Sequence, residues 1–173
     1  MNMDNVYKIK KNLRVPMVLA TLISIPVFLD VIMAGFNLSV LLMALLFMIL
    51  FYLLTINNML RMVRINGSHV TIRGLLGSRK IPVGEITRVD GVTMGTRQFI
   101  TLSTGKRNYL IPNSFESFQG IISDLESVVR GEAVGDGLAP LKENLIVRKS
   151  DVTGVWITVI LLAIIIVIRF FPR

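Results

Sequence analysis

The residues that could carry catalysis are few and scattered in this chain. His69 is the single histidine among 173 residues and cysteine is absent, so a thiolate nucleophile, a disulfide and a cysteine zinc site are excluded. His69 stands in an expected strand beside a turn, and no base or orienting group is marked as its partner. A hydrogen-bonded structural histidine is the favoured interpretation. We expect no catalytic residue, no metal site and no cofactor.

The glycines do not form a phosphate-binding loop. Five of them recur through the middle of the chain, at Gly67, Gly74, Gly77, Gly84 and Gly91. None stands in the G-x-x-x-x-G-K-[ST] or G-x-G-x-x-G pattern that cradles phosphate groups. Turn glycines between short strands are the favoured interpretation.

Basic side chains are the most prominent polar feature. The chain has 19 Lys and Arg against 11 Asp and Glu, a net charge of +8. Six of the basic residues fall in or near expected loops: Arg73, Arg79, Lys80, Arg97, Lys106 and Arg107. They form either a solvated positive face or a contact surface for anionic lipid headgroups, where each well-placed charge contributes about 1 kcal/mol. Acidic residues are mixed among them, so nucleic acid is not an expected partner.

Three polar residues stand within long apolar runs and are the candidates for an intramembrane site. Asp30 is the ionisable one, and burying its charge in lipid is costly. It stands close before a turn at Gly35, so a structural or interfacial role is favoured over transport. Asn57 and Asn58 are expected to make interhelical hydrogen bonds or to be solvated at the membrane interface.

The apolar runs indicate membrane-spanning helices. Hydrophobic residues make up 53% of the chain and charged ones 17%, which is typical of a membrane protein. About 20 apolar residues cross the hydrocarbon core as a helix, and segments 15–36, 40–60 and 152–171 reach that length. The neutral turn between the first two predicts a helical hairpin. A signal peptide is the rival interpretation of the first segment, which is long for one.

Positive charge flanks these segments on one side. The basic flanking residues are Lys8, Lys10, Lys11 and Arg14, then Arg61 and Arg64, then Lys142, Arg148 and Lys149. Such residues accumulate on cytoplasmic loops. We therefore expect a multi-pass protein of the inner (cytoplasmic) membrane, with the polar region after the hairpin in the cytoplasm and the C-terminus outside.

The stretch 61–131 is polar enough to fold in water. Six short β-rich segments separated by turn residues are expected strands: 61–65, 69–73, 79–83, 85–92, 99–102 and 108–111. The first two and the last two form expected hairpins. Short strands with regular glycines indicate a small antiparallel barrel or sandwich.

One amphipathic helix is predicted after the strands. Apolar residues recur at steps of three and four, as Phe115, Phe118, Ile121, Ile122, Leu125, Val128 and Val129. Asn113 and Glu116 have the spacing of a capping box, and Gly131 is placed to end the helix.

This order of elements resembles the bacterial pleckstrin-homology-like domain of small membrane proteins. The resemblance rests on Ile81-Pro82-Val83-Gly84-Glu85-Ile86 midway and on Ile111-Pro112-Asn113-Ser114-Phe115 entering the helix, and it covers residues 61–130. It implies a partly open barrel of about seven strands, plugged at one end by the face of Phe115, Phe118 and Leu125. It also implies a binding or scaffolding module without catalytic residues.

The expected organisation is helical membrane segments joined to an α+β module. The predicted parts are a basic N-terminus (1–14), a transmembrane hairpin (15–60), the pleckstrin-like module (61–131), a flexible glycine-rich linker (132–151) and a third transmembrane helix (152–173). The expected function is a non-enzymatic scaffold or adaptor that binds membrane lipids and a protein partner, either another membrane protein or a second copy of this chain.

Two other functions stay open at this point. The first is an accessory subunit of an oligomeric transporter or channel, with Asp30, Asn37, Asn57 and Asn58 lining a path. The second is a membrane-bound enzyme, which ranks last because no group of residues carries a reaction.

Overall fold

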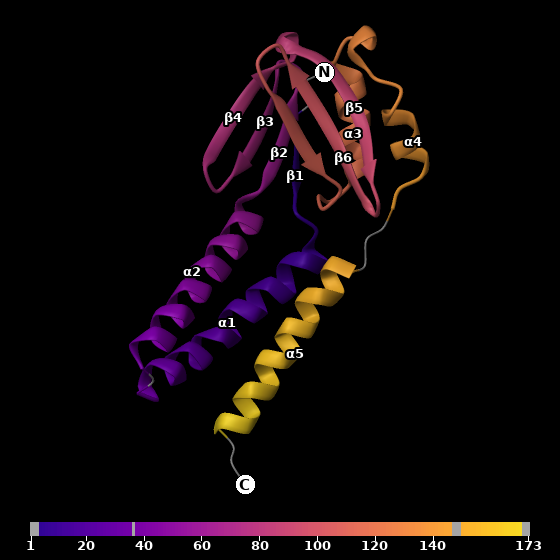
Figure 1. The fold of residues 1–173 in the computed structure, drawn as a ribbon. Coiled ribbons are helices and arrows are strands. Elements are labelled where there is room, and N and C mark those ends of the chain that lie inside the picture. Colours follow the sequence, from indigo (N-terminus) through magenta and orange to yellow (C-terminus); the bar gives the residue numbers. More distant parts are fainter. Residues whose placement is uncertain (1–3, 36, 147–149, 171–173) are drawn as a thin grey trace. The chain divides into compact units, whose positions relative to one another are not determined.

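The computed structural model describes residues 4–35, 37–146 and 150–170 (Figure 1). The chain divides into two compact units. Met1–Lys10 and Leu60–Arg148 form the first, which we call the β-module; Lys11–Met59 and Lys149–Arg173 form the second, which we call the helical unit. Some residues used in the sequence-based predictions lie outside the described ranges: Phe36, Arg148, Lys149 and the last residues of the chain.

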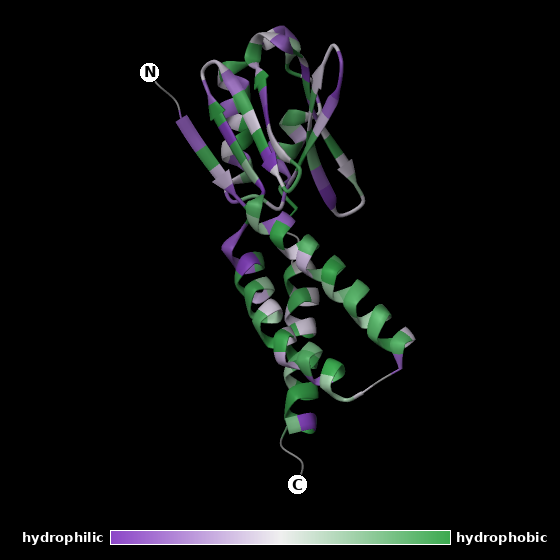
Figure 2. Cartoon of the chain, turned by 90° about the vertical axis from the view of Figure 1, so that its left-hand side faces the viewer, coloured by the Kyte–Doolittle hydropathy of each residue, from purple (hydrophilic) through white to green (hydrophobic). Residues whose placement is uncertain are grey.

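The helical unit contains the three predicted membrane segments as helices. They are α1 (Lys11–Met33), α2 (Leu38–Leu60) and α5 (Ser150–Phe170). Among the described residues, these helices are long and apolar enough to cross a membrane. Apolar residues run along most of their length (Figure 2), and few of these side chains are buried. A helix that is apolar on all sides and exposed is suited to lipid rather than to water.

The β-module contains two antiparallel sheets in the part of the chain that the structure describes. The first has the order β1 (Asp4–Lys8), β2 (Met62–Asn66), β3 (His69–Gly74) and β4 (Gly77–Pro82). The second has the order β5 (Ile86–Met94), β6 (Arg97–Thr104) and β7 (Asn108–Pro112). The two predicted hairpins are confirmed as β2–β3 and β6–β7. Because the two ladders are separate, the α+β arrangement is established while a barrel stays a prediction.

Residues Asp4–Lys8 form a strand, although the sequence indicated only a basic flank. β1 pairs along β2, from Asp4 opposite Asn66 to Lys8 opposite Met62. Its short polar sequence has little apolar alternation, and its partner lies beyond two long helices, so periodicity could not reveal it. The whole α1–α2 hairpin is thus inserted where a tight turn would join two antiparallel strands. Its first and last residues must therefore lie at the same end of the β-module.

Side-chain hydrogen bonds fasten β1 to the helix α3 (Phe118–Val128). The hydroxyl of Tyr7 donates to Oδ2 of Asp124 at 2.6 Å, and Nδ2 of Asn5 donates to the same oxygen at 2.8 Å. Burial first, and then the Asp124 carboxylate, raise the pKa of Tyr7 well above its usual value. The hydroxyl is protonated at neutral pH in any case, and the raised pKa lets it keep donating in alkaline solution as well.

The predicted apolar face of α3 is confirmed, but its predicted ends are wrong. Phe118, Ile121, Ile122 and Leu125 are buried in the core. Asn113 and Glu116 lie before the helix and do not cap it, because the chain first turns at Ser117, whose φ is 50°. The helix ends at Val128, and Gly131 instead begins a short 3₁₀ turn, η2 (Gly131–Ala133).

The segment predicted as a flexible linker packs against β5. Val134 forms a parallel bridge with Val89, and the amide of Gly135 donates to the carbonyl of Val89 at 2.7 Å. The next helix, α4 (Leu138–Glu143), buries two of its leucines, Leu138 and Leu141. The described part of this segment therefore belongs to the β-module.

Gly137 of this segment and Gly91 of β5 allow their backbones to approach closely. The glycines here therefore serve packing rather than flexibility. A Cβ on Gly91 would lie 2.0 Å from the carbonyl oxygen of Gly137, and a Cβ on Gly137 would lie 2.4 Å from that of Gly91. Oδ1 of Asp90 accepts hydrogen bonds from the amides of Gly91 at 2.9 Å and Gly137 at 3.1 Å. The glycines that indicated a flexible linker are therefore required for this close packing.

We expect Gly91→Ala to destabilise the protein by about 1–3 kcal/mol, because the new methyl group has no space beside α4. Gly105→Ala is the matched control, since a Cβ there meets nothing within 4 Å. Thermal unfolding of the full chain in detergent measures both. Equal melting temperatures for the two variants would contradict the packed position of this segment.

Candidate functional site

The chain enters and leaves the β-module at one end, which we call the exit end. Lys10 directly precedes α1, and its amide donates to the carbonyl of Ser114 at 3.0 Å. Met62, the first residue of β2, follows α2 by two positions and pairs with Lys8. Two of the three connections to the helical unit are therefore adjacent.

A pair of buried amides holds the third connection at the same end. Gln98 is 2% exposed and Asn113 is 8% exposed. Oε1 of Gln98 accepts from the amide of Ile146 at 2.9 Å, and Nε2 of Gln98 donates to the carbonyl of Asn144 at 2.7 Å. Nδ2 of Asn113 donates to the carbonyl of Ile146 at 3.1 Å. Asn113 adjoins Ser114, so residue 146, just before α5, is fixed beside Lys10.

Two hairpin tips also point to the exit end. Arg73 pairs with Met62, so the turn of Leu75 and Leu76 between β3 and β4 lies beyond the start of β2. Arg97 opens β6 next to Gln98, so the β5–β6 turn lies near the buried amides. Neither turn was predicted to be a functional feature of the chain. The signal that could have marked the first is the Leu-Leu pair at a turn position.

The opposite end of the β-module holds a pocket of about 580 Å³, and we call it the pocket end. It is lined by the β2–β3 turn, the 3₁₀ turn η1 (Val83–Glu85), the start of β5 and the segment after α3. The lining residues are Gly67, Ser68, Val83, Gly84, Ile86, Thr87, Val128, Arg130, Glu132 and Ala133. They come from separate stretches of sequence, so no local motif could have predicted the pocket.

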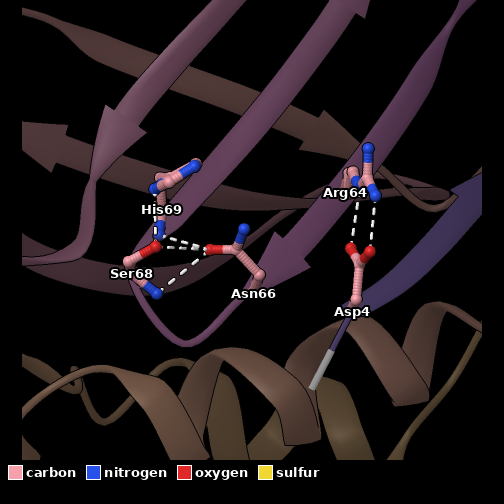
Figure 3. Close-up of polar contacts among 5 residues, drawn as sticks. All are labelled: Asp4, Arg64, Asn66, Ser68 and His69. Carbon is pink, nitrogen blue, oxygen red and sulfur yellow. Dashed lines mark hydrogen bonds and ion pairs between the residues drawn. The ribbon is translucent and has the colours of Figure 1, made fainter. Parts of the chain in front are cut away.

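Hydrogen bonds around Asn66 shape one rim of the pocket (Figure 3). Oδ1 of Asn66 accepts from the amide of Ser68 at 3.0 Å and from that of His69 at 2.7 Å. The hydroxyl of Ser68 lies 2.7 Å from Nδ1 of His69. His69 is half-buried and bonded within its own turn, and its structural role stays a prediction.

An ion pair on the outer side of the first sheet is also visible in Figure 3. Nε of Arg64 donates to Oδ1 of Asp4 at 2.6 Å, and the guanidinium makes a second contact with Oδ2. This contact with Arg64 lowers the pKa of Asp4. Both side chains are about half exposed to solvent, so the pair holds β1 in register more than it stabilises the fold.

The six basic residues predicted to contact lipid headgroups are all exposed, but they do not form one surface. Arg73, Arg79 and Lys80 belong to the β3–β4 hairpin, Arg97 begins β6, and Lys106 and Arg107 lie in the β6–β7 turn. Arg73 and Arg97 are at the exit end. Lys106 and Arg107 are at the pocket end, because Thr104 pairs with Ile86.

Asp30 has a basic partner inside the helical unit. Its Oδ2 accepts a hydrogen bond from Nε of Arg169 at 2.8 Å, which joins α1 to α5. Apolar side chains that include Val27, Ile165 and Ile168 surround the pair. Each charge therefore neutralises the other close to the ends of two apolar helices.

The asparagines proposed for a transport path lie at helix ends. Oδ1 of Asn37 accepts from the amide of Val40 at 3.0 Å and so caps α2. Asn57 and Asn58 are half-buried in the last turns of α2. A polar contact between α1 and α2 joins Ser24 to Tyr52, whose hydroxyl groups lie 3.2 Å apart.

Comparison with known proteins identifies no family for this chain. The chain matches no family model, no curated protein and no solved structure. The resemblance to pleckstrin-homology-like domains therefore stays a prediction.

We expect Asp30→Asn and Arg169→Gln each to destabilise the helical unit by about 1–3 kcal/mol, because each leaves one charge without its counter-ion. The double variant should lose less than the sum of the two. Unfolding of the purified protein by titration with a denaturing detergent measures this double-mutant cycle. Strictly additive losses would contradict the ion pair.

Proposed function

We propose that this protein is a non-enzymatic scaffold of the membrane, in which the β-module holds a protein partner at its pocket end. The observation that supports the proposal is the separation of the two ends. All three connections to the helical unit leave from the exit end, and the pocket lies at the other end of the β-module. A module with one end connected to the helices and a pocket at its other end is suited to binding a partner.

The fold that we propose for the module is pleckstrin-homology-like. Six strands, β2 to β7, and then one helix with a buried face lie within residues 61–130, which the resemblance covers, and β1 adds a seventh strand from before α1. A bridge between Ile9 and Phe115 brings the end of β1 close to the segment after β7. These features support a partly open barrel that α3 fills.

We further propose that the module faces the cytoplasm from the inner membrane of a bacterium. The pairing of β1 with β2 requires both ends of the α1–α2 hairpin to lie on one side of the membrane. Basic residues flank both of those ends, whereas the turn between α1 and α2 carries no charge. The rule that positive residues stay inside therefore supports a cytoplasmic module.

The pocket is suited to a protein segment because its rim offers space and polar groups. A Cβ on Gly67 or on Gly84 would meet nothing within 4 Å, so a partner's backbone can approach there. Arg130 and Glu132 add opposite charges to the pocket lining. The partner is another membrane protein or a second copy of this chain, since confinement to one membrane raises the effective concentration of both.

A single experiment with cysteine variants tests the partner and the orientation, because the chain has no cysteine of its own. Gly84→Cys reports on the pocket, Gly105→Cys is its matched control in an open turn outside the pocket lining, and Ala34→Cys reports on the α1–α2 turn. In intact cells, a membrane-impermeant maleimide should label only Ala34→Cys. In opened native membranes, Gly84→Cys should react more slowly than in the purified protein, whereas Gly105→Cys should react equally in both.

The two parts of the proposal can fail separately. Labelling of Gly84→Cys in intact cells would contradict the cytoplasmic orientation. Equal reactivity of Gly84→Cys in native membranes and after purification would show that nothing occupies the pocket, which would contradict the scaffold function.

A further inference from the structure

We propose that the tip of the β3–β4 hairpin inserts Leu75 and Leu76 into the boundary between lipid headgroups and acyl chains. The membrane is the same one that anchors the helices. This inference rests on the membrane anchoring of the proposed function and does not depend on the pocket or its partner.

The two leucines occupy positions where leucine has no local advantage. Residues 75 and 76 form the turn between Gly74 and Gly77, and Gly77 has a φ of +113°. Gly, Asn, Asp, Pro and Ser dominate such turns because they suit the backbone or hydrogen-bond to it. Leu76 is fully exposed at 103%, and Leu75 is 37% exposed. Two exposed leucines at a turn depart from this residue preference. Such departures are expected mainly at functional positions.

Basic residues flank the leucines on both strands. Arg73 lies two positions before Leu75 and pairs with Ser78, while Arg79 and Lys80 follow on β4. All three basic side chains are exposed. An apolar tip with a basic collar matches a bilayer that has an apolar interior and anionic headgroups.

The covalent chain keeps this tip within reach of the membrane. Leu60 ends α2, and Met62 follows it by two residues. Arg73 is the β-partner of Met62, and Leu75 lies two residues further along, about 7 Å at the rise of a strand. Interfacial elements bury their apolar side about 5–10 Å into the headgroup boundary. The connection from α2 to this hairpin is therefore short enough for the tip to reach that boundary.

The neighbouring tip at the exit end repeats the pattern, and the turn at the pocket end does not. The β5–β6 tip carries Met94, which is 68% exposed, and Arg97. The β6–β7 turn carries Lys106 and Arg107 beside Gly105, without an apolar residue. Apolar and basic residues are thus combined where the helices leave the module, which favours the bilayer over a soluble partner as the occupant.

Depth-dependent fluorescence quenching of the full chain in vesicles tests the proposal. A bimane fluorophore on Ser78→Cys reports on the tip, and one on Gly105→Cys reports on the pocket end. With nitroxide-labelled lipids in phosphatidylglycerol vesicles, the label at Ser78→Cys should be quenched more than the label at Gly105→Cys. Leu75→Ser combined with Leu76→Ser should reduce quenching at position 78 to the level at position 105.

Two further variants separate the apolar contribution from the basic one. Leu110→Ser removes a leucine that is 62% exposed on β7, and it should leave quenching at position 78 unchanged. Arg73→Gln combined with Arg79→Gln should reduce quenching in phosphatidylglycerol vesicles and have less effect in phosphatidylcholine vesicles, because the attraction is electrostatic.

The proposal is overturned if position 78 is quenched no more than position 105, or if the leucine substitutions leave its quenching unchanged. A tip that is not quenched in pure lipid, but is shielded from a cysteine reagent in native membranes, would assign the leucines to a protein partner instead. In native membranes, the slower maleimide reaction of Gly84→Cys should persist when Leu75 and Leu76 are both replaced by serine. Failure of tip insertion is therefore distinguishable from failure of the scaffold function.

Discussion

The pairing of β1 with β2 is the constraint on which the rest of the structure depends. These two strands are separated in the chain by both helices of the transmembrane hairpin, yet Lys8 lies opposite Met62. The hairpin therefore replaces the turn of a β-hairpin, and its two ends cannot lie on opposite sides of a membrane. Tyr7 and Asn5 extend the constraint to α3 through Asp124, so this mostly exposed edge strand is fastened to the β-module by side chains as well as by its pairing with β2.

All connections to the helices leave from the same end of the module: β1–β2 pairing brings two of them together, and the side-chain amides of two buried residues hold the third. Gln98 and Asn113 satisfy their amides on the backbone around Ile146, where an unsatisfied amide would cost about 1–3 kcal/mol. All three connections to the helical unit therefore leave the β-module from the exit end. The Leu75–Leu76 tip lies at the exit end of the β-module, and the pocket lies at the pocket end.

Elements with local signals could be predicted from the sequence, and elements defined by distant contacts could not. The apolar face of α3 and the turn at Asn66 follow from periodicity and turn chemistry. β1 was missed because its pairing with β2 crosses two helices. The glycines at 135 and 137 indicated flexibility, whereas their close approach to Asp90 and Gly91 is visible only once β5 is in place. Asp30 was recognised as a candidate, but its partner Arg169 lies at the far end of the sequence.

The register of β1 on β2 can be measured directly in this cysteine-free chain. Val6 lies opposite Arg64, a separation that a disulfide can span, so Val6→Cys with Arg64→Cys should form an intramolecular disulfide under mild oxidation. Val6→Cys with Lys80→Cys is the matched control, because Lys80 lies on β4 beyond β2 and β3. Mass spectrometry of the digested protein identifies the linked peptides. A disulfide in the first variant and none in the second is the predicted result; no disulfide in the first, or one only between two chains, would contradict the account.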